Sequence, residues 1–237
     1  MPPQTKDDFL NGQIVLVDKP LGWTSFQAVN AVRWAIRRKF DIKKIKVGHA
    51  GTLDPLATGL LLICTGKFTK NIHELQGLIK EYKGIITLGA TTPSFDLETE
   101  INQEFSINHI NEQQIRDVAT GFIGNIEQQP PVYSALKKDG KRLYEYAREG
   151  KKVTINTRSV EILEFEITNI ELPQIFFRVV CSKGTYIRSL ADDFGKALDS
   201  GGHLSELRRT KIGDYNVNKA LTPKNIQEII LAKPPNP

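Results

Sequence analysis

The sequence predicts an α+β fold with a mixed, largely antiparallel central sheet flanked by helices and loops. Predicted strands and helices are mixed without strict β-α-β alternation, which argues against a doubly wound parallel sheet. Three predicted strands over residues 153–157, 159–168 and 174–182 follow one another with short turns, which favours antiparallel pairing. A hydrophobic content of 40% over 237 residues supports a folded core.

The N-terminal third alternates strands with short helices. Apolar residues at 14–17 predict a strand, and Thr24 or Ser25 is suited to cap a helix with Phe26, Val29, Val32 and Ile36 on its apolar face. The continuous apolar run at 60–64 predicts a fully buried strand. A short helix at 69–76 and a strand at 79–88 complete this part.

The remaining elements follow the same rules of periodicity and capping. Asn108 is expected to cap a helix ending near Thr120, and Gly201-Gly202 stops a helix over 187–198 with Ile187, Leu190, Phe194 and Leu198 on one face. Further strands are expected at 122–127 and 204–215, and a last helix begins within 221–224.

Composition narrows the functional classes. The net charge is +5 and the isoelectric point about 9.1, which permits a nucleic-acid partner without proving one. Cys64 and Cys181 lie far apart in apolar runs, so no metal site is expected and two buried free thiols suit a reducing cytoplasm. The N-terminus has no apolar signal core, and no window approaches a membrane span.

The stretch Val47–Gly59, VGHAGTLDPLATG, organises the chain. Its glycines allow unusual backbone angles, and Pro55 biases Asp54 toward an extended conformation. Asp54 is therefore a carboxylate on a stiff loop with Leu53 and Leu56 on either side. It is either a reactive group on that platform or a turn residue, and the stretch alone favours the turn.

Two segments concentrate positive charge. Residues 33–46 carry seven cations, of which some complement the dipole of a helix C-terminus and the excess suggests a phosphate-facing patch. Residues 130–152 hold seven Lys or Arg, three acids and three tyrosines. Cations interleaved with aromatic rings suit RNA, whereas a solvated loop and helix with Tyr144 packed down is equally compatible with the pattern.

Several motifs together resemble the TruB family of bacterial-type tRNA pseudouridine synthases. Besides GHAGTLDP at 48–55, the chain has VDKPLGWTS at 17–25, KEYK at 80–83, YSALK at 133–137, GKRLYEYAR at 140–148, CSKGTYIR at 181–188 and LRR at 207–209. All occur in the order of the family, from about Gln13 to Thr222. The resemblance implies the pseudouridine synthase fold and isomerisation of uridine to pseudouridine in the T-loop of tRNA, at position 55, after the base is flipped out.

The resemblance also implies the catalytic residues. Asp54 matches the essential aspartate of the family, Arg188 the arginine that pairs with it, and Tyr82 the tyrosine that stacks on the target base. Whether Asp54 attacks the sugar, attacks the base or removes a sugar proton stays open. The reaction needs no cofactor, and the sequence has no P-loop, GxGxxG or metal-ligand cluster.

Further residues are expected to bind RNA by the same resemblance. His49 would fill the space that the flipped base leaves, and Tyr186 and Leu207 would line the base pocket. Without the resemblance, Tyr186 and Leu207 would be core residues and Tyr82 a strand aromatic. The remaining substrate contacts are assigned to cations of the matching motifs: Lys19, Lys137, Lys141 and Arg142. His73, His109 and His203 have no evident partners and are expected at the surface.

The expected domain organisation is one catalytic domain over 1–225, with 130–152 as an insertion that grips RNA, and a short tail over 226–237 in place of a full C-terminal RNA-binding domain. The loop at 89–96 departs from the family, which more often has two aspartates there, because only Asp96 remains. The expected partner is the T-arm stem-loop of tRNA, with a monomeric, cytoplasmic enzyme that requires no membrane or protein partner. Two other hypotheses are a non-catalytic RNA-folding module and a guide-dependent synthase; the second is disfavoured by the missing C-terminal domain.

Overall fold

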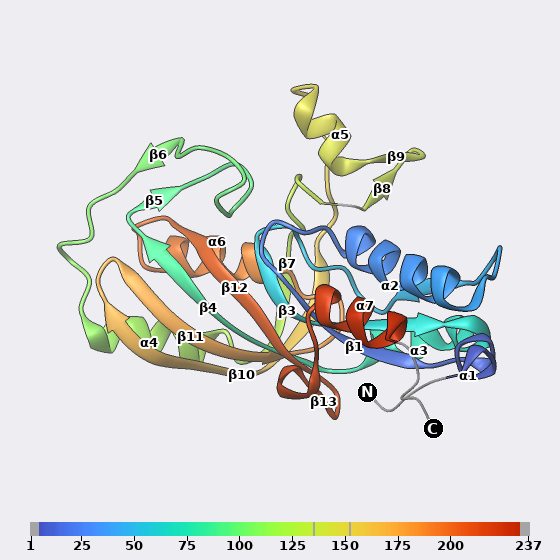
Figure 1. Cartoon of the computed structure of the whole chain (residues 1–237). Helices are drawn as coiled ribbons and strands as arrows, with labels where there is room; N and C mark the ends of the chain where they lie inside the picture. The colour runs from blue at the N-terminus through green and yellow to red at the C-terminus, as the bar shows by residue number, and fades with distance from the viewer. Residues whose placement is uncertain (1–4, 135, 152, 233–237) are drawn as a thin grey trace. The chain divides into compact units, whose positions relative to one another are not determined.

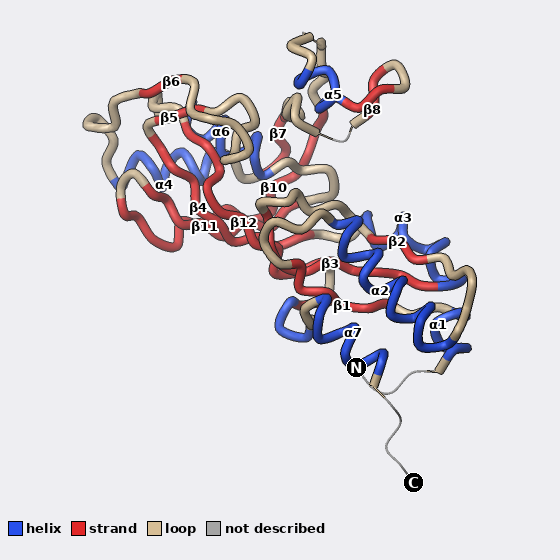
Figure 2. Tube along the Cα trace, turned by 45° about the horizontal axis from the view of Figure 1, so that its top comes forward, coloured by secondary structure: helices blue, strands red, loops and turns tan. Residues whose placement is uncertain are grey.

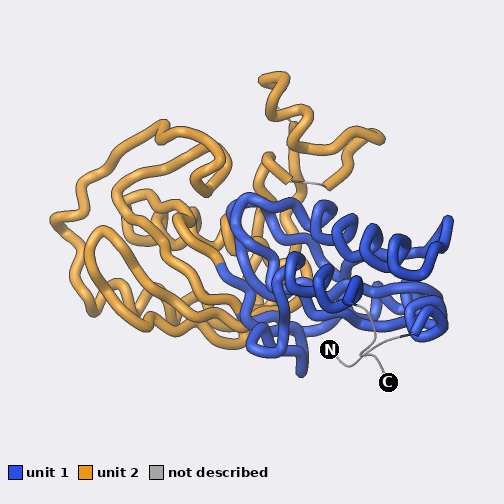
Figure 3. The backbone as a smooth tube through the Cα atoms, in the orientation of Figure 1, with its two compact units in different colours: residues 1–81, 208–237 blue, residues 82–207 orange. Residues whose placement is uncertain are grey.

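The structure, a computed structural model, describes residues 5–134, 136–151 and 153–232, and the chain divides into two compact units. Unit 1 comprises residues 1–81 and 208–237, and unit 2 comprises residues 82–207 (Figure 3). Two strands, β4 (Lys80–Leu88) and β12 (Gly202–Ile212), have residues in both units.

Unit 1 is built on β1 (Ile14–Lys19) and β3 (Ala57–Thr65), which pair antiparallel from Ile14–Cys64 to Lys19–Gly59. The short strand β2 (Val47–His49) also pairs antiparallel with β3. The first residues of β4 and the last of β12 continue this part of the sheet, and β13 (Tyr215–Asn216) folds back on β12. The predicted strand at 60–64 is confirmed and is fully buried.

Two helices of unit 1, α2 (Ser25–Phe40) and α7 (Pro223–Leu231), lie side by side (Figure 1). Their apolar faces share one core cluster with residues of β1 and β3. Thr24 caps α2 in a capping box with Gln27, so the predicted start of this helix is confirmed. The remaining helical elements of this unit are α1 (Lys6–Asn11), η1 (Gly66–Asn71), α3 (Ile72–Gly77) and η2 (Val217–Lys219).

Unit 2 contains the strand order β12-β4-β11-β10-β7. The long strands β10 (Arg158–Glu171) and β11 (Gln174–Cys181) form an antiparallel hairpin, and β10 pairs antiparallel with β7 (Gly124–Gln128) on its other side. A second small sheet joins β5 (Ala90–Thr91) to β6 (Gln103–Glu104). The α+β class and the largely antiparallel sheet are thus confirmed.

The helices α4 (Glu112–Gly121) and α6 (Ile187–Ala197) cover the sheet of unit 2 through an aromatic cluster. Phe165 of β10 packs against Phe194 of α6 at 5.6 Å and against Phe122, next to α4, at 6.3 Å between ring centroids. The hairpin of β8 (Lys137–Lys138) and β9 (Lys141–Arg142), with α5 (Leu143–Arg148), stands apart from this sheet (Figure 2).

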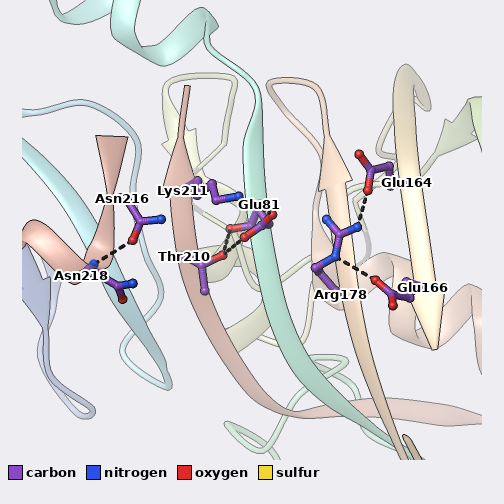
Figure 4. Close-up of polar contacts among 8 residues, drawn as sticks. All are labelled: Glu81, Glu164, Glu166, Arg178, Thr210, Lys211, Asn216 and Asn218. Atoms are coloured by element: carbon purple, nitrogen blue, oxygen red, sulfur yellow. Dashed lines mark hydrogen bonds and ion pairs between the residues drawn. The ribbon is translucent and has the colours of Figure 1, made fainter. Parts of the chain in front are cut away.

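Charged side chains bridge neighbouring strands within each unit. In unit 2, Arg178 of β11 binds Glu164 and Glu166 of β10 (Figure 4). In unit 1, the buried Glu81 accepts hydrogen bonds from Thr210 Oγ1 at 2.7 Å and Lys211 Nζ at 3.1 Å (Figure 4). These contacts add cross-strand attraction on the polar faces of the sheet.

Some local predictions are wrong, each for a physical reason. Phe26 is 62% exposed, because Ser25 takes the inward-facing position at the start of α2. The second predicted helix begins at Glu112, since Asn111 rather than Asn108 forms the capping box, with Gln114. Residues 153–157 form no strand, so β10 pairs with β7 instead.

His203, expected at the surface, is buried, with Nδ1 3.0 Å from the carbonyl oxygen of Ala90. Both cysteines are buried and free, as expected, and burial raises the pKa of the Cys64 thiol to about 11. Some residues of the predicted insertion and tail, namely Ala135, Lys152 and 233–237, lie outside the described residues. Residues 226–231, expected in a tail, belong to α7.

Candidate active site

Asp54 is half-buried in unit 1, on the loop that joins β2 to β3. The preceding residue, Leu53, is tied to the start of α2: its amide donates to Ser25 Oγ at 2.9 Å, and that hydroxyl donates to the Leu53 carbonyl at 3.0 Å. On the other side, the Gly22 amide donates to the Pro55 carbonyl at 2.8 Å. Asp54 therefore lies between two anchored backbone positions. Leu53 is buried as an apolar neighbour, whereas Leu56 is exposed.

Arg209 of β12 forms hydrogen bonds with the backbone of the same loop. Its buried guanidinium donates to the carbonyl oxygens of Leu60 at 2.8 Å, Gly51 at 3.1 Å and Thr52 at 3.4 Å. Hydrogen bonds to a charged donor are stronger than neutral ones, and buried carbonyls without partners are costly. The side chain thus fixes both ends of the segment that carries Asp54.

Gly59 makes this arrangement possible. A Cβ atom there would lie 2.3 Å from the Arg209 carbonyl oxygen, and the glycine has φ of 104°. Only glycine satisfies both conditions, because other residues rarely adopt such an angle and would collide with backbone. The glycine that follows the loop is therefore required for β3 and β12 to approach each other.

Lys19 places a second buried nitrogen near Asp54. Its side chain is fully buried at the end of β1, with Nζ donating to the carbonyls of Trp23 at 2.7 Å and Pro20 at 3.1 Å. Burial lowers its pKa to about 8, the charge of Asp54 opposes that shift and Arg209 adds to it. Below that pH, Lys19 is a buried cation whose charge interacts with that of Asp54.

His49 is the last residue of β2, at the start of the loop that carries Asp54. Burial and the neighbouring Arg209 lower the pKa of its imidazole, while a hydrogen bond with the backbone of Gly51 partly opposes this. Since the ordinary value is already below neutral pH, His49 is uncharged at pH 7. A neutral ring is better suited to stacking or filling space among bases than to pairing with a phosphate.

Arg188, in the first turn of α6, is buried within unit 2. Its Nη1 donates to the Ser94 carbonyl at 3.2 Å, and its Nε lies 3.6 Å from Oδ2 of the buried Asp96. Asp96 Oδ1 in turn accepts from the Glu98 amide at 3.0 Å. The one aspartate left in the 89–96 loop thus holds the guanidinium of Arg188, and the predicted pairing of Arg188 with Asp54 stays a prediction.

The other predicted pocket residues of unit 2 lie in three different elements. Tyr186 precedes α6, where Gln128 bonds its amide at 2.7 Å and its carbonyl at 3.0 Å, and the Arg158 guanidinium lies 4.8 Å from its ring. Tyr82 is a buried residue of β4. Leu207 is half-buried in β12. Each position is compatible with its predicted role, and none of the three roles is tested by it.

Lys137, Lys141 and Arg142 come together in the β8–β9 hairpin, where Lys137 faces Arg142. Asp139 and Gly140 form its turn with positive φ at both residues, the backbone that an Asp-Gly pair favours. Lys141 binds Glu149 and lies 5.0 Å from the Tyr146 ring, and the guanidinium of Arg142 lies 5.9 Å from the Tyr144 ring. The predicted mixture of cations and aromatic rings is therefore one small structural element.

The structure adds residues that the sequence reasoning did not single out. Ser25 was considered only as a helix cap and Arg209 only as part of a motif, yet both fix the Asp54 loop. Asp96 was noted only as the aspartate that remains in the 89–96 loop, whereas it positions Arg188. Its position as the one carboxylate of a loop rich in Thr, Pro and Ser was the available signal.

Two other kinds of site are absent from the residues that the structure describes. No group of three or more His, Cys, Asp or Glu side chains could hold a metal ion there. No helix within residues 5–232, apart from the undescribed positions, is long and apolar enough to cross a membrane.

Two domain models of known pseudouridylate synthases match the chain. The N-terminal domain of the TruB family pseudouridylate synthases matches residues 37–187, and the C-terminal domain of tRNA pseudouridylate synthase B matches residues 188–234. The chain belongs to the TruB family of tRNA pseudouridine synthases. The second match begins at Arg188, within unit 2, so the boundary of the family domains differs from that of the compact units.

Curated members of the TruB family resemble the chain over almost its whole length. The tRNA pseudouridine synthase B of Flavobacterium johnsoniae is 63% identical, over 92% of this chain and 95% of the relative. That of Parabacteroides distasonis is 51% identical, over 94% and 95%.

Among solved structures, a chain in a Cbf5–Nop10–Gar1 complex is 28% identical with a TM-score of 0.69, over 95% of this chain. A chain in an H/ACA RNP bound to a substrate RNA containing 2′-deoxyuridine is also 28% identical, with a TM-score of 0.66 over 93% of this chain. The present chain spans only 56% and 53% of those two chains. They confirm the pseudouridine synthase fold.

Proposed function

We propose that this protein isomerises uridine to pseudouridine in the T-loop of tRNA, at position 55, with Asp54 as the essential catalytic residue. Membership of the TruB family and the names of its curated relatives support the reaction and the tRNA substrate. The observation that carries the assignment to Asp54 is the loop itself, in which Ser25, Arg209 and Gly22 hold the backbone on both sides of one carboxylate.

The chemistry explains why a fixed carboxylate is useful. Conversion of uridine to pseudouridine breaks the C1′–N1 bond, turns the base and joins C1′ to C5. C5 loses its proton and N1 gains one, so there is no net redox change. The sugar carbon becomes electron-poor as the first bond breaks, and an ionised carboxylate next to it stabilises that charge or bonds to it. Lys19, while protonated, is a buried cation whose charge attracts that of Asp54.

The other site residues take supporting roles in this proposal. Arg188, positioned by Asp96, supplies a second cation for the catalytic carboxylate. Tyr82 stacks on the target base, with Tyr186 and Leu207 lining its pocket. A flipped base leaves a gap in the stacked T-loop, which the neutral ring of His49 occupies.

Binding of the T-arm stem-loop is assigned to the β8–β9 hairpin with Lys137, Lys141 and Arg142, and to the rest of the 130–152 insertion. Lys19, which is fully buried, is assigned to the surroundings of Asp54 instead. We further propose that the enzyme is a monomer of the cytoplasm, that it needs no cofactor or protein partner, and that residues 1–225 act as one catalytic domain. The similarity to chains in a Cbf5–Nop10–Gar1 complex and in an H/ACA RNP bound to a substrate RNA motivates guide-dependent action as the alternative.

The test is pseudouridine formation in a synthetic T-arm stem-loop by the wild type and by Asp54→Asn, which keeps the shape and removes the charge. We expect product from the wild type alone, a loss of at least about a thousand-fold in rate for the variant, and RNA affinity within a few-fold. Equal losses of rate and affinity would make Asp54 a structural residue.

Tight binding without product from the wild type, on the stem-loop and on whole tRNA, would favour the RNA-folding module instead. Product that appears only after a guide RNA and partner proteins are added would favour the guide-dependent alternative. Product with whole tRNA but not with the stem-loop would place essential recognition outside the T-arm.

A further inference from the structure

The outer face of α2, near its C-terminal end, carries a basic surface that the proposed site does not use. We call it the α2 shelf, and it consists of Arg33, Trp34, Arg37, Arg38 and Lys43. Residues 33–46 contain seven Lys or Arg and one Asp, an excess of six positive charges. The whole chain has a net charge of +5, so the rest of the molecule is close to neutral. A field concentrated in this way attracts a polyanion to one place.

The macrodipole of α2 accounts for only part of this charge. Arg37, Arg38 and Lys39 lie in its last turn, where cations are favourable. Lys43 and Lys44 lie beyond the helix and are exposed. None of the seven cations makes an ion pair with a carboxylate among the described residues. Asp41, which ends the helix in a left-handed conformation, lines the shelf as its one carboxylate.

Two of the shelf cations are held in place by hydrogen bonds to uncharged groups. Arg33 donates to Asn30 Oδ1 and, at 2.8 Å, to the Val47 carbonyl. Arg37 Nε donates to the Ile42 carbonyl at 3.4 Å. Side chains held in one conformation lose less entropy when a ligand binds, and these donors retain further N–H groups for phosphate oxygens.

An aromatic ring lines the same hollow as these cations. Trp34 is 47% exposed on the polar face of α2, and the Arg38 guanidinium lies 5.2 Å from its ring centroid. The five shelf residues, with Asn30, Asp41 and Ile42, line an open hollow of about 660 Å³. An exposed ring that shares a hollow with several guanidinium groups is the combination with which proteins stack a base and neutralise its phosphates.

The shelf lies within reach of RNA bound at Asp54, because both belong to unit 1. Ser25 begins α2 and holds Leu53, the neighbour of Asp54. Trp34 lies nine residues further along the helix, roughly 14 Å at a rise of 1.5 Å per residue. Arg33, the neighbour of Trp34, donates a hydrogen bond to the carbonyl of Val47, which lies two residues before His49. A strand of a few nucleotides spans such a distance.

We propose that the α2 shelf is a second RNA-binding site, which takes backbone phosphates and one unstacked base from tRNA a few nucleotides away from the target uridine. This inference rests on the proposed function. Its role is affinity and register, and it leaves the chemical step to Asp54. Anionic lipid is the other polyanion that a basic surface attracts, but an exposed ring next to a guanidinium plane suits a nucleobase better.

The experiment compares wild type, Arg37→Gln/Arg38→Gln/Lys43→Gln and Trp34→Ala in the full chain. All four positions are exposed, so the fold should be retained. The control is Lys6→Gln/Lys219→Gln/Lys224→Gln, which removes the same charge from exposed positions of unit 1 outside the shelf. Affinity for whole tRNA is measured from 50 to 300 mM salt, together with the single-turnover rate at saturating RNA.

For the triple shelf variant we expect the slope of log Kd against log salt to shrink by about 2 to 3, or 0.7–0.9 per lost phosphate contact. Its affinity at low salt should fall about ten-fold or more, with the saturated rate unchanged. Trp34→Ala should lose about five-fold in affinity without a change in slope.

An unchanged slope and affinity in the triple shelf variant would overturn the proposal, and so would an equal loss in the control. Binding of the wild type to anionic vesicles that the shelf substitutions abolish, with tRNA binding unchanged, would assign the shelf to lipid and also overturn it. If the wild type binds tRNA but forms no pseudouridine, the proposed function fails while the binding data still decide the shelf.

Discussion

The loop of Asp54 and the β8–β9 hairpin are both proposed to serve the same RNA, yet they are held in opposite ways. The loop is fixed by buried groups that bond to backbone, from Ser25 and Arg209, and by the close approach of Gly59 to another strand. The hairpin is held by surface pairs such as Lys141–Glu149 and by cations next to tyrosine rings.

The difference follows from what each region has to do. A reacting carboxylate displaced by about 1 Å loses much of its effect, so its backbone must be over-determined. Exposed ion pairs contribute little to stability and exchange readily for other partners, which suits a surface that adapts to phosphates. The comparison predicts that changes in the loop affect stability and rate, whereas changes in the hairpin affect binding.

The largest effect is expected from adding one methyl group. Gly59→Ala would place a Cβ atom against the Arg209 backbone at a positive φ, so the free energy of unfolding should fall by about 4 kcal/mol or more. Gly140→Ala in the hairpin is the matched control, because φ there is also positive but the space is open. It should cost only about 1–2 kcal/mol of backbone strain. Urea unfolding of both variants checks this, and equal small losses would contradict the account of the loop.

A smaller effect is expected from the buried lysine next to the loop. The pKa of Lys19 is about 8 when folded and near 10.5 when unfolded, so between those values the unfolded chain binds the extra proton. Stability from this group is therefore lowest below pH 8 and rises with pH up to about 10.5. The wild type should gain stability relative to Lys19→Met between pH 7.5 and 10, as measured by urea unfolding. A constant difference would mean that Lys19 is not desolvated.

How far the sequence could predict this molecule depends on the range of the interaction. Local patterns predicted the buried strand at 60–64, the capped start of α2 and the loop that carries Asp54. The predicted strand at 153–157 failed because strand pairing is set by distant partners, here β7 with β10. The prediction that Phe26 faces the core is wrong, because Ser25 takes the inward-facing position and bonds to Leu53, 28 positions away.

The candidate site shows the same limit. The motifs supplied Asp54, Arg188 and the cations of the hairpin, and the pattern of the sequence alone supplied little more than a turn. The role of Arg209 depends on a contact with Leu60, 149 positions earlier, and the pairing of Asp96 with Arg188 likewise joins distant segments. Spacing within a motif carries no information about such contacts.

The most direct test of the contrast is a parallel measurement of single-turnover rate and RNA affinity for Ser25→Ala and Lys137→Gln/Arg142→Gln. Ser25→Ala removes both hydrogen bonds to Leu53, at a cost of about 1–3 kcal/mol. We expect its saturated rate to fall at least about ten-fold with Kd nearly unchanged. The hairpin variant should keep its saturated rate and stability while Kd rises several-fold and its salt dependence weakens. A loss of affinity for Ser25→Ala, or of saturated rate for the hairpin variant, would contradict the division between a fixed catalytic loop and an adaptable RNA-binding hairpin.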